Sequence, residues 1–145
     1  IFTSNDGEVI FKKYSPIGEL SAFAGQYAEI LHKTSSRPVI VCDRDHVVSA
    51  SGLPKKELLE RRISPALEEL IEERKSYIYG QQGGALLYPV EGIERPALVE
   101  YPIISAGDVC GSILFLADGE PTVPTEAEEK LLQAAAGFLG KQMEE

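Results

Sequence analysis

Residues 97–116 read ALVEYPIISAGDVCGSILFL, two apolar segments separated by the four residues SAGD at 105–108. Residues 97–104 and 109–116 both have the composition of β-strands. The segment between them is short and contains Gly107, so it predicts a tight turn. Two strands joined by a short turn pair antiparallel, whereas parallel strands need a long crossover. The stretch therefore predicts an antiparallel sheet and not the βαβ repeat of a doubly wound fold.

A second strand pair is expected earlier in the chain. Residues 39–42 read VIVC, a continuous apolar run typical of a central strand that is covered on both faces. Residues 43–45 then form a tight turn, and residues 46–50 return as the hairpin partner. Residues 77–80 and 85–90 are weaker strand candidates. Together these segments predict one antiparallel sheet whose strands differ in length.

Helices are expected before, within and after these strands. Ser15-Pro16 is a helix start, with serine as N-cap and proline at the first helical position, and that helix ends near residue 34. Residues 55–60 form a short helix, and another follows Ser64-Pro65 to about residue 75. Thr125 and Glu128 have the spacing of a capping box before the last helix.

The order of elements predicts an α+β fold. The N- and C-terminal helices are expected on one face of the central antiparallel sheet, and the short helices and loops of residues 52–76 on the other. This arrangement is typical of sensing domains of the GAF or PAS kind.

Composition limits the functional classes. The chain has 145 residues, enough for one domain with a substantial core, and its longest apolar runs are far shorter than a membrane span. A net charge of −9 argues against direct binding to nucleic acid, whose affinity comes mainly from Lys and Arg on phosphates. Cys42 and Cys110 lie in apolar runs and are expected to be buried, reduced thiols, which favours the cytoplasm; a disulfide or a reactive thiol is the alternative.

No catalytic machinery is evident in the sequence. His32 and His46 have no nucleophilic or acidic neighbour at a motif spacing, so exposed or capping roles are expected for them. The glycine-rich residues 80–84 lack the Lys-Ser/Thr of a phosphate loop, and no metal-binding motif is present. We therefore predict that the chain is not an enzyme and holds no cofactor or metal.

A ligand pocket is the main functional hypothesis from the sequence. Strand alternation places Cys110, Ser112 and Leu114 on one face, and Val109, Ile113 and Phe115 on the other, beneath the terminal helices. The first face has smaller and more polar side chains, which suits a chamber beneath the short helices. The candidate pocket residues are Ile40, Cys42, Cys110, Ser112 and Leu114. An ordinary, ligand-free core face is the alternative.

Both terminal helices carry an apolar stripe wider than one sheet face requires, which predicts a second partner for them. We therefore expect a two-fold homodimer through a four-helix bundle. Gly137 and Gly140 would allow close approach of the helices. The predicted interface residues are Ile17, Leu20, Ala24, Tyr27, Leu31, Leu132, Ala135, Leu139 and Met143.

The N-terminal residues suggest that another domain precedes this one. Ile1 is not an initiator methionine, and Asp6-Gly7 is a strong hairpin-turn dipeptide. A lone hairpin is marginal in water, so its two arms are expected to belong to a sheet completed by upstream strands. We therefore expect residues 1–14 to be the end of a preceding domain and residues 15–145 to be the domain described above.

Three stretches resemble the stage V sporulation protein T family: residues 6–16 (DGEVIFKKYSP), residues 41–45 (VCDRD) and residues 134–144 (AAAGFLGKQME). The resemblance covers nearly the whole chain and is weakest over residues 76–98. It implies a transcriptional regulator of spore-forming bacteria that joins an AbrB-type DNA-binding domain to a C-terminal GAF-type domain. Residues 1–14 would then be the end of the DNA-binding domain.

The resemblance also implies a function. The domain would sense a small-molecule effector, oligomerise, and bias the geometry of the attached DNA-binding domain, through which alone DNA would be contacted. A purely structural dimerisation module without a ligand is the alternative. An enzyme of the GAF-like methionine sulfoxide reductase type would need a cluster of reactive cysteines, which two strand-embedded cysteines do not supply.

Overall fold

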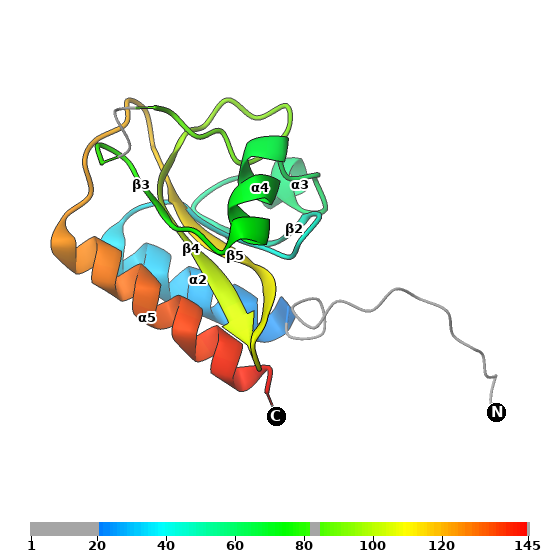
Figure 1. Ribbon diagram of the computed structural model, residues 1–145. Coiled ribbons are helices and arrows are strands. Elements are labelled where there is room, and N and C mark those ends of the chain that lie inside the picture. The colour runs from blue at the N-terminus through cyan, green and yellow to red at the C-terminus, as the bar shows by residue number, and fades with distance from the viewer. Residues whose placement is uncertain (1–20, 82–84, 145) are drawn as a thin grey trace.

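A five-stranded antiparallel sheet forms the centre of the molecule (Figure 1). The computed structural model describes residues 21–81 and 85–144. The strand order is β2-β1-β5-β4-β3. The strands are β1 (Val39–Cys42), β2 (Val47–Ser51), β3 (Tyr77–Ile78), β4 (Ala97–Ser105) and β5 (Asp108–Leu116). The hairpin of β4 and β5 supplies the two longest strands, as residues 97–116 predicted.

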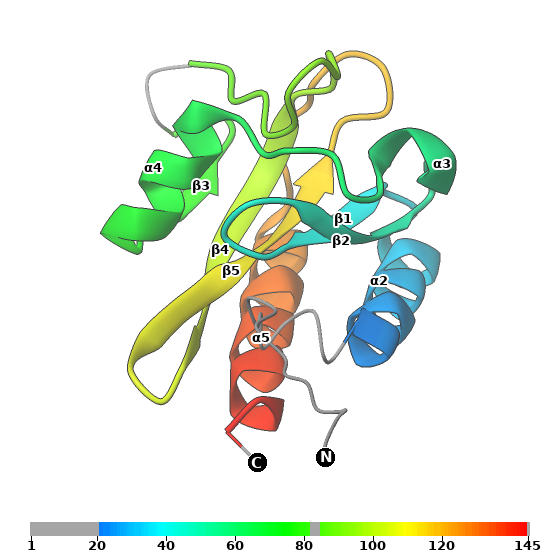
Figure 2. The same cartoon turned by 90° about the vertical axis from the view of Figure 1, so that its right-hand side faces the viewer.

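Helices cover both faces of this sheet. α2 (Ser21–Ser35) and α5 (Glu126–Gln142) pack side by side on one face, while α3 (Lys55–Leu58) and α4 (Pro65–Glu73) lie over the other (Figures 1 and 2). The α+β architecture and the placement of the helices are therefore confirmed. Among the described residues, no helix has the length and apolar character needed to cross a bilayer.

The two faces bury two separate apolar clusters. The cluster under α2 and α5 is centred on Phe115, Ile113 and Val41. The cluster under α3 and α4 contains Ile40 and Leu114 from the sheet, together with side chains of the short helices. The sheet is thus buried on both faces, which explains why β1 is a continuous apolar run.

Local sequence signals set the ends of two helices. Thr125 Oγ1 accepts a hydrogen bond from the Glu128 amide, and the Glu128 carboxylate accepts one from the Thr125 amide, so the predicted capping box is confirmed. Ser64 Oγ accepts from the Leu67 amide at 3.3 Å, and Pro65 occupies the first position of α4.

The structure corrects one strand prediction, and several other predictions lie outside the residues it describes. The strand predicted at residues 85–90 is wrong: the chain there makes only an isolated bridge between Val90 and Ile63. Pro89 cannot donate to a ladder, and its carbonyl instead accepts from the Ser64 amide. The predictions for residues 1–14, the helix start at Ser15-Pro16, and the interface positions Ile17 and Leu20 lie outside the described residues.

Candidate functional site

The strand register brings most of the predicted pocket residues together. Ile40 lies opposite Leu114, and Cys42 lies opposite Ser112, across the β1–β5 pair. Ile40, Cys42 and Leu114 belong to the cluster that faces α3 and α4. The predicted alignment of β1 with β5 on this face is therefore confirmed.

Cys110 does not join them, which corrects the prediction. Ile103 pairs with Gly111 and Ile104 with Val109, so Cys110 is an extra residue in a β-bulge. A bulge reverses the alternation of side chains before it. Val109 therefore packs in the cluster beneath α3 and α4, and Cys110 packs against the cluster on the opposite face.

Glu100 is the unexpected member of this face. It lies opposite Leu114 on β5 and opposite Tyr77 on β3, so the row Ile40, Leu114, Glu100, Tyr77 crosses four strands. Glu100 has 0% of its surface exposed, as does Ser112. Among the described residues, there is no hydrogen-bond partner for either carboxyl oxygen of Glu100 or for the Ser112 hydroxyl. We call the sheet surface formed by Ile40, Cys42, Glu100, Ser112 and Leu114 the Glu100 face.

Burial changes the acidity of the groups on this face. Desolvation raises the pKa of Glu100 to about 8, because the low-dielectric surroundings disfavour the carboxylate. Burial also raises the pKa of the Cys42 thiol, with smaller contributions from the charges of Asp43 and Glu100. Tyr77 has a raised pKa from burial as well, and its hydroxyl donates to the Ala85 carbonyl. Cys42 is therefore an inert thiol rather than a nucleophile.

Sequence reasoning missed Glu100, although a signal was present. Residues 97–104 are apolar apart from Glu100 and Tyr101, and an acidic residue within an otherwise apolar strand is unusual. Its burial could not be read from the sequence. That burial requires both the cover of α4 and the pairing of β3 with β4, which are contacts between distant segments.

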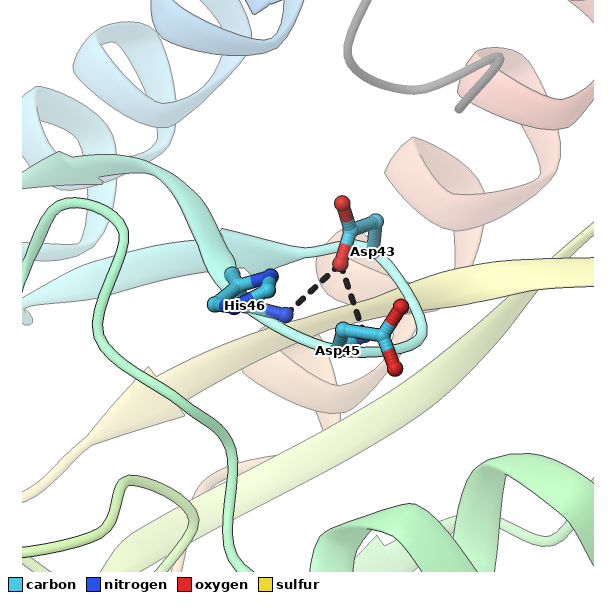
Figure 3. A group of neighbouring side chains, drawn as sticks. All are labelled: Asp43, Asp45 and His46. Atoms are coloured by element: carbon cyan, nitrogen blue, oxygen red, sulfur yellow. Dashed lines mark hydrogen bonds between the residues drawn. The ribbon is translucent and has the colours of Figure 1, made fainter. Parts of the chain in front are cut away.

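A second group of ligand-type side chains lies on the turn between β1 and β2. Asp43, Asp45 and His46 place their ligand atoms within 4.8 Å of one another (Figure 3). One carboxyl oxygen of Asp43 accepts from the backbone amides of Asp45 and His46, each at 2.7 Å. These bonds form an Asx turn, which accounts for an aspartate at this position. His46 thus has acidic neighbours in space, which the sequence spacing did not indicate.

Comparison with known families identifies the relatives of this chain. Residues 19–144 match the family described as "Stage V sporulation protein T C-terminal, transcription factor". The chain belongs to this family. It is 38% identical over 147 residues to stage V sporulation protein T of Bacillus subtilis (strain 168), an alignment that covers 100% of this chain and 80% of that protein. The resemblance drawn from the sequence motifs is confirmed.

Solved structures support the fold of this member of the stage V sporulation protein T family. The GAF domain of an Acinetobacter phosphoenolpyruvate-protein phosphotransferase superposes with a TM-score of 0.63 at 13% identity, covering 91% of this chain and 84% of that one. The cofactor-binding GAF domain of the nutrient sensor CodY from Clostridium difficile gives 0.55 at 10% identity, covering 82% and 83%. The domain therefore has a GAF fold, and it is a regulatory domain of a transcription-factor family.

The terminal helices of this family member face the sheet with the stripe that was predicted to face a partner. Five of the predicted interface residues are buried against their own sheet, so their assignment to a dimer interface is wrong: Ala24, Leu31, Leu132, Ala135 and Leu139. Tyr27 and Met143 are only partly buried. Gly140 lies against the backbone of Ile104, so it allows close packing within the chain, while a Cβ added at Gly137 would have no described residue within 4 Å.

A different stripe of the same helices faces outward. Phe23, Ile30 and Phe138 have 45%, 59% and 53% of their surfaces exposed. The rings of Tyr27 and Phe138 contact each other with centroids 5.5 Å apart, so they join the two helices into one apolar surface. We call this surface, formed by Phe23, Tyr27, Ile30, Leu131 and Phe138, the outer stripe.

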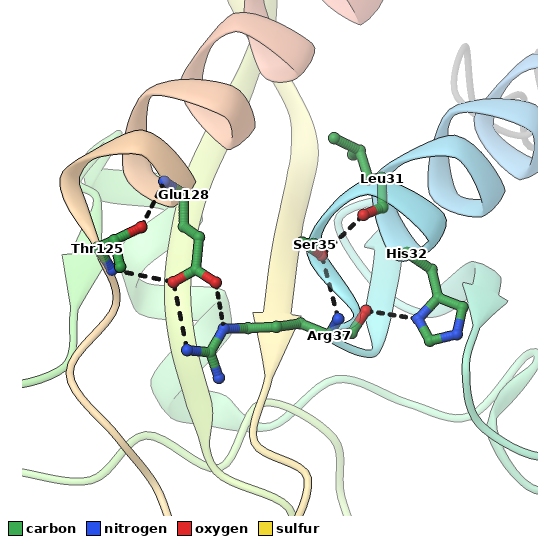
Figure 4. A network of polar contacts seen from close by, with 6 residues as sticks. All are labelled: Leu31, His32, Ser35, Arg37, Thr125 and Glu128. Carbon is green, nitrogen blue, oxygen red and sulfur yellow. Dashed lines mark hydrogen bonds and ion pairs between the residues drawn. The ribbon is translucent and has the colours of Figure 1, made fainter.

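A polar network ties the end of α2 to the start of α5 (Figure 4). The Arg37 guanidinium donates two hydrogen bonds to the Glu128 carboxylate, at 2.8 and 3.2 Å. Burial alone would raise the pKa of Glu128, but hydrogen bonds from Arg37 and Thr125 together lower it. The His32 ring nitrogen Nδ1 lies 2.8 Å from the carbonyl oxygen of Arg37, which is beyond the end of α2, so this contact ties the helix to the following loop and is not a helix cap. The network fixes the position of α2 relative to α5.

Proposed function

We propose that this domain is the sensing and oligomerisation module of a transcriptional regulator. A small molecule bound at the Glu100 face would favour one arrangement of α2 and α5, and these helices would pass that change to an attached DNA-binding domain. Residues 1–14 are proposed to be the end of that domain, and DNA would be contacted only through it. The membership of a transcription-factor family supports this role, and no catalysis is proposed.

The buried and unpartnered Glu100 carboxyl is the observation that carries the sensing role. Buried polar atoms in folded proteins are nearly always hydrogen-bonded, and those that are not deserve a functional explanation. Glu100 and Ser112 lie on the same face of the sheet, so two buried groups on one face lack hydrogen-bond partners among the described residues. A ligand that supplies the missing hydrogen bonds accounts for both.

The path from the Glu100 face to the terminal helices is short. β5 contributes Ser112 and Leu114 to the Glu100 face, and the alternate residues Ile113 and Phe115 to the cluster beneath α2 and α5. A displacement of β5 would therefore move side chains in both apolar clusters at once. The bidentate Arg37–Glu128 pair would then make α2 and α5 move together.

The outer stripe supports homodimerisation. Single exposed apolar residues are normal, but a contiguous surface of two phenylalanines, an isoleucine and a tyrosine on adjacent helices marks an interaction site. The partner we propose for the outer stripe is the same surface of a second copy, because a two-fold axis would bring α2 and α5 of both chains into a four-helix bundle.

The dimer is tested by sedimentation. We expect the wild-type protein to be a dimer at tens of micromolar and Phe138→Glu to be a folded monomer, because the introduced carboxylate would be desolvated in the interface. Gln133→Glu is the matched control: Gln133 is exposed on the other flank of α5 and should leave the dimer intact. A monomeric wild type, or a Phe138→Glu variant that still dimerises, would contradict the proposed interface.

A metabolite screen distinguishes the proposed sensing domain from the alternative, a structural dimerisation module without a ligand. We expect at least one compound of a broad panel of cytosolic metabolites to raise the melting temperature of the wild-type protein, because a ligand that binds only the folded state stabilises it. The same compound should stabilise the Ser112→Ala variant less. A panel without any stabilising compound, combined with a confirmed dimer, would favour the structural module.

A further inference from the structure

We propose that the Glu100 face binds a small organic cation, an ammonium or guanidinium group carried on an apolar body. This inference rests on the sensing role proposed above and names its ligand class. The inference follows from the two buried polar groups that lack partners among the described residues, from the apolar side chains around them, and from the helices that cover the face.

Glu100 and Ser112 are close enough to share one ligand group. Glu100 pairs with Leu114, and Ser112 is two residues before Leu114 on the same strand. The two side chains are therefore diagonal neighbours, whose separation is roughly 7–8 Å across a strand pair and within reach of a long side chain. An ammonium between them can donate to the carboxylate and to the hydroxyl with two of its three hydrogens.

No cationic side chain of residues 21–81 and 85–144 supplies these hydrogen bonds. In the described segments the ion pairs join Arg37 to Glu128, Lys75 to Glu73, Arg95 to Asp118, and Lys141 to Glu144, and none of them involves Glu100. Burial is the cause of the raised pKa of Glu100. The part of the chain that the structure describes therefore offers Glu100 no ion-pair partner.

The elements packed against Glu100 contribute neutral side chains. Leu58 comes from α3, and Leu67 and Ile71 from α4. The titratable groups that share the face are Cys42 and Tyr77, and burial raises the pKa of both, so they remain uncharged near neutral pH. The apolar body of a ligand would contact these side chains, and its polar end would bind the carboxyl group of Glu100.

A cation matches this site better than a neutral or anionic ligand. Hydrogen bonds to a charged group are about twice as strong as neutral ones, and the low dielectric strengthens the attraction between opposite charges. An anion would be repelled by the Glu100 carboxylate and would keep Glu100 in its protonated form, whereas a cation is attracted to the carboxylate and favours the ionised form. Part of the cost of burying a charged ligand is offset because the Glu100 carboxyl group is already buried, and a bound cation would favour its carboxylate form.

The cover of the face must open to admit a ligand. α3 and α4 pack on the sheet through buried apolar side chains, and the strand that follows α4, β3, has only two residues paired with β4. Glu100 itself is fully enclosed. The apparent affinity is therefore reduced by the cost of this opening, and binding couples to a rearrangement of the covering layer.

Three probes with one carbon skeleton test the ligand class: 3-methylbutylamine, 3-methylbutanol and 3-methylbutanoate. We expect the amine to bind the wild-type protein more tightly than the alcohol in calorimetry, and the acid not to bind. In Glu100→Gln the affinity for the amine should fall by about tenfold or more, because a charge-assisted hydrogen bond is lost. Butylguanidine should behave as the amine does.

Glu69→Gln is the matched control, because Glu69 is an exposed acid on α4. It should leave the affinity for the amine unchanged. Equal binding of amine and alcohol, no amine binding at all, or an unchanged affinity in Glu100→Gln would each overturn the ligand class. If the metabolite screen instead finds a neutral or anionic ligand whose binding depends on Ser112, this inference fails while the proposed sensing role stands.

Discussion

We expect the free energy of unfolding of the wild-type protein to fall by a few kcal/mol as the pH rises from about 5 to about 8. The cause is Glu100, whose pKa is about 8 in the folded protein against an ordinary value of 4.5. Between these values the folded state keeps a proton that the unfolded state has released. Rising pH therefore favours unfolding, and the loss is complete above the folded-state pKa.

The Glu100→Gln variant should lose most of this dependence, because glutamine keeps the shape of the side chain without its ionisation. Urea unfolding of both proteins at several pH values measures the effect, and the difference between them isolates Glu100 from other titrating groups. We expect the variant to be more stable than the wild type at pH 8 and similar to it at pH 5. Parallel pH profiles of the two proteins would contradict the burial of an unpaired carboxyl.

Glycine-to-alanine substitutions at two neighbouring turns of α5 should have opposite effects on stability. A Cβ at Gly140 would lie far inside van der Waals distance of the Ile104 carbonyl oxygen, which is backbone and cannot rotate away. A Cβ at Gly137 would meet nothing within 4 Å. Both substitutions improve helix propensity by about 1 kcal/mol, so packing decides the difference between them.

We therefore expect Gly137→Ala to raise the free energy of unfolding by about 1 kcal/mol and Gly140→Ala to lower it by about 2 kcal/mol or more. Urea unfolding at one fixed protein concentration gives both values, since a dimer would make stability depend on concentration. Gly140→Ser should be at least as destabilising as Gly140→Ala. Similar stabilisation by both alanine variants would show that α5 does not pack closely against β4 at this position.

The two glycines illustrate what the sequence could not assign. Both were expected to allow approach of a second helix, because a small residue in a helix reads the same wherever it faces. In the structure, Gly140 allows α5 to pack closely on its own sheet. The same ambiguity affected the apolar stripes: helical periodicity shows that Leu132 and Leu139 share a face, but not that this face meets the sheet rather than a partner.

The alternation of β5 failed at one point for a similar reason. Residues 112–116 alternate as predicted, with Ser112 and Leu114 on the Glu100 face. The bulge at Cys110 depends on how β4 and β5 pair near their turn; the isolated glycine at 111 is compatible with a bulge or a close backbone approach but does not place the extra residue. Gly111 fits tightly there, since a Cβ would collide with the backbone of Cys42 on the neighbouring strand.

The sequence by itself determined the features that depend on neighbouring residues. The turn within residues 97–116 established an antiparallel sheet, Thr125 and Glu128 set the start of α5, and the family motifs are local strings. Only the tertiary structure decided which helical stripe faces outward, where Cys110 points, and that Glu100 is buried without a partner. Each of these depends on contacts between segments far apart in the chain, and the burial of Glu100 arises only when β3, β5 and α4 enclose it.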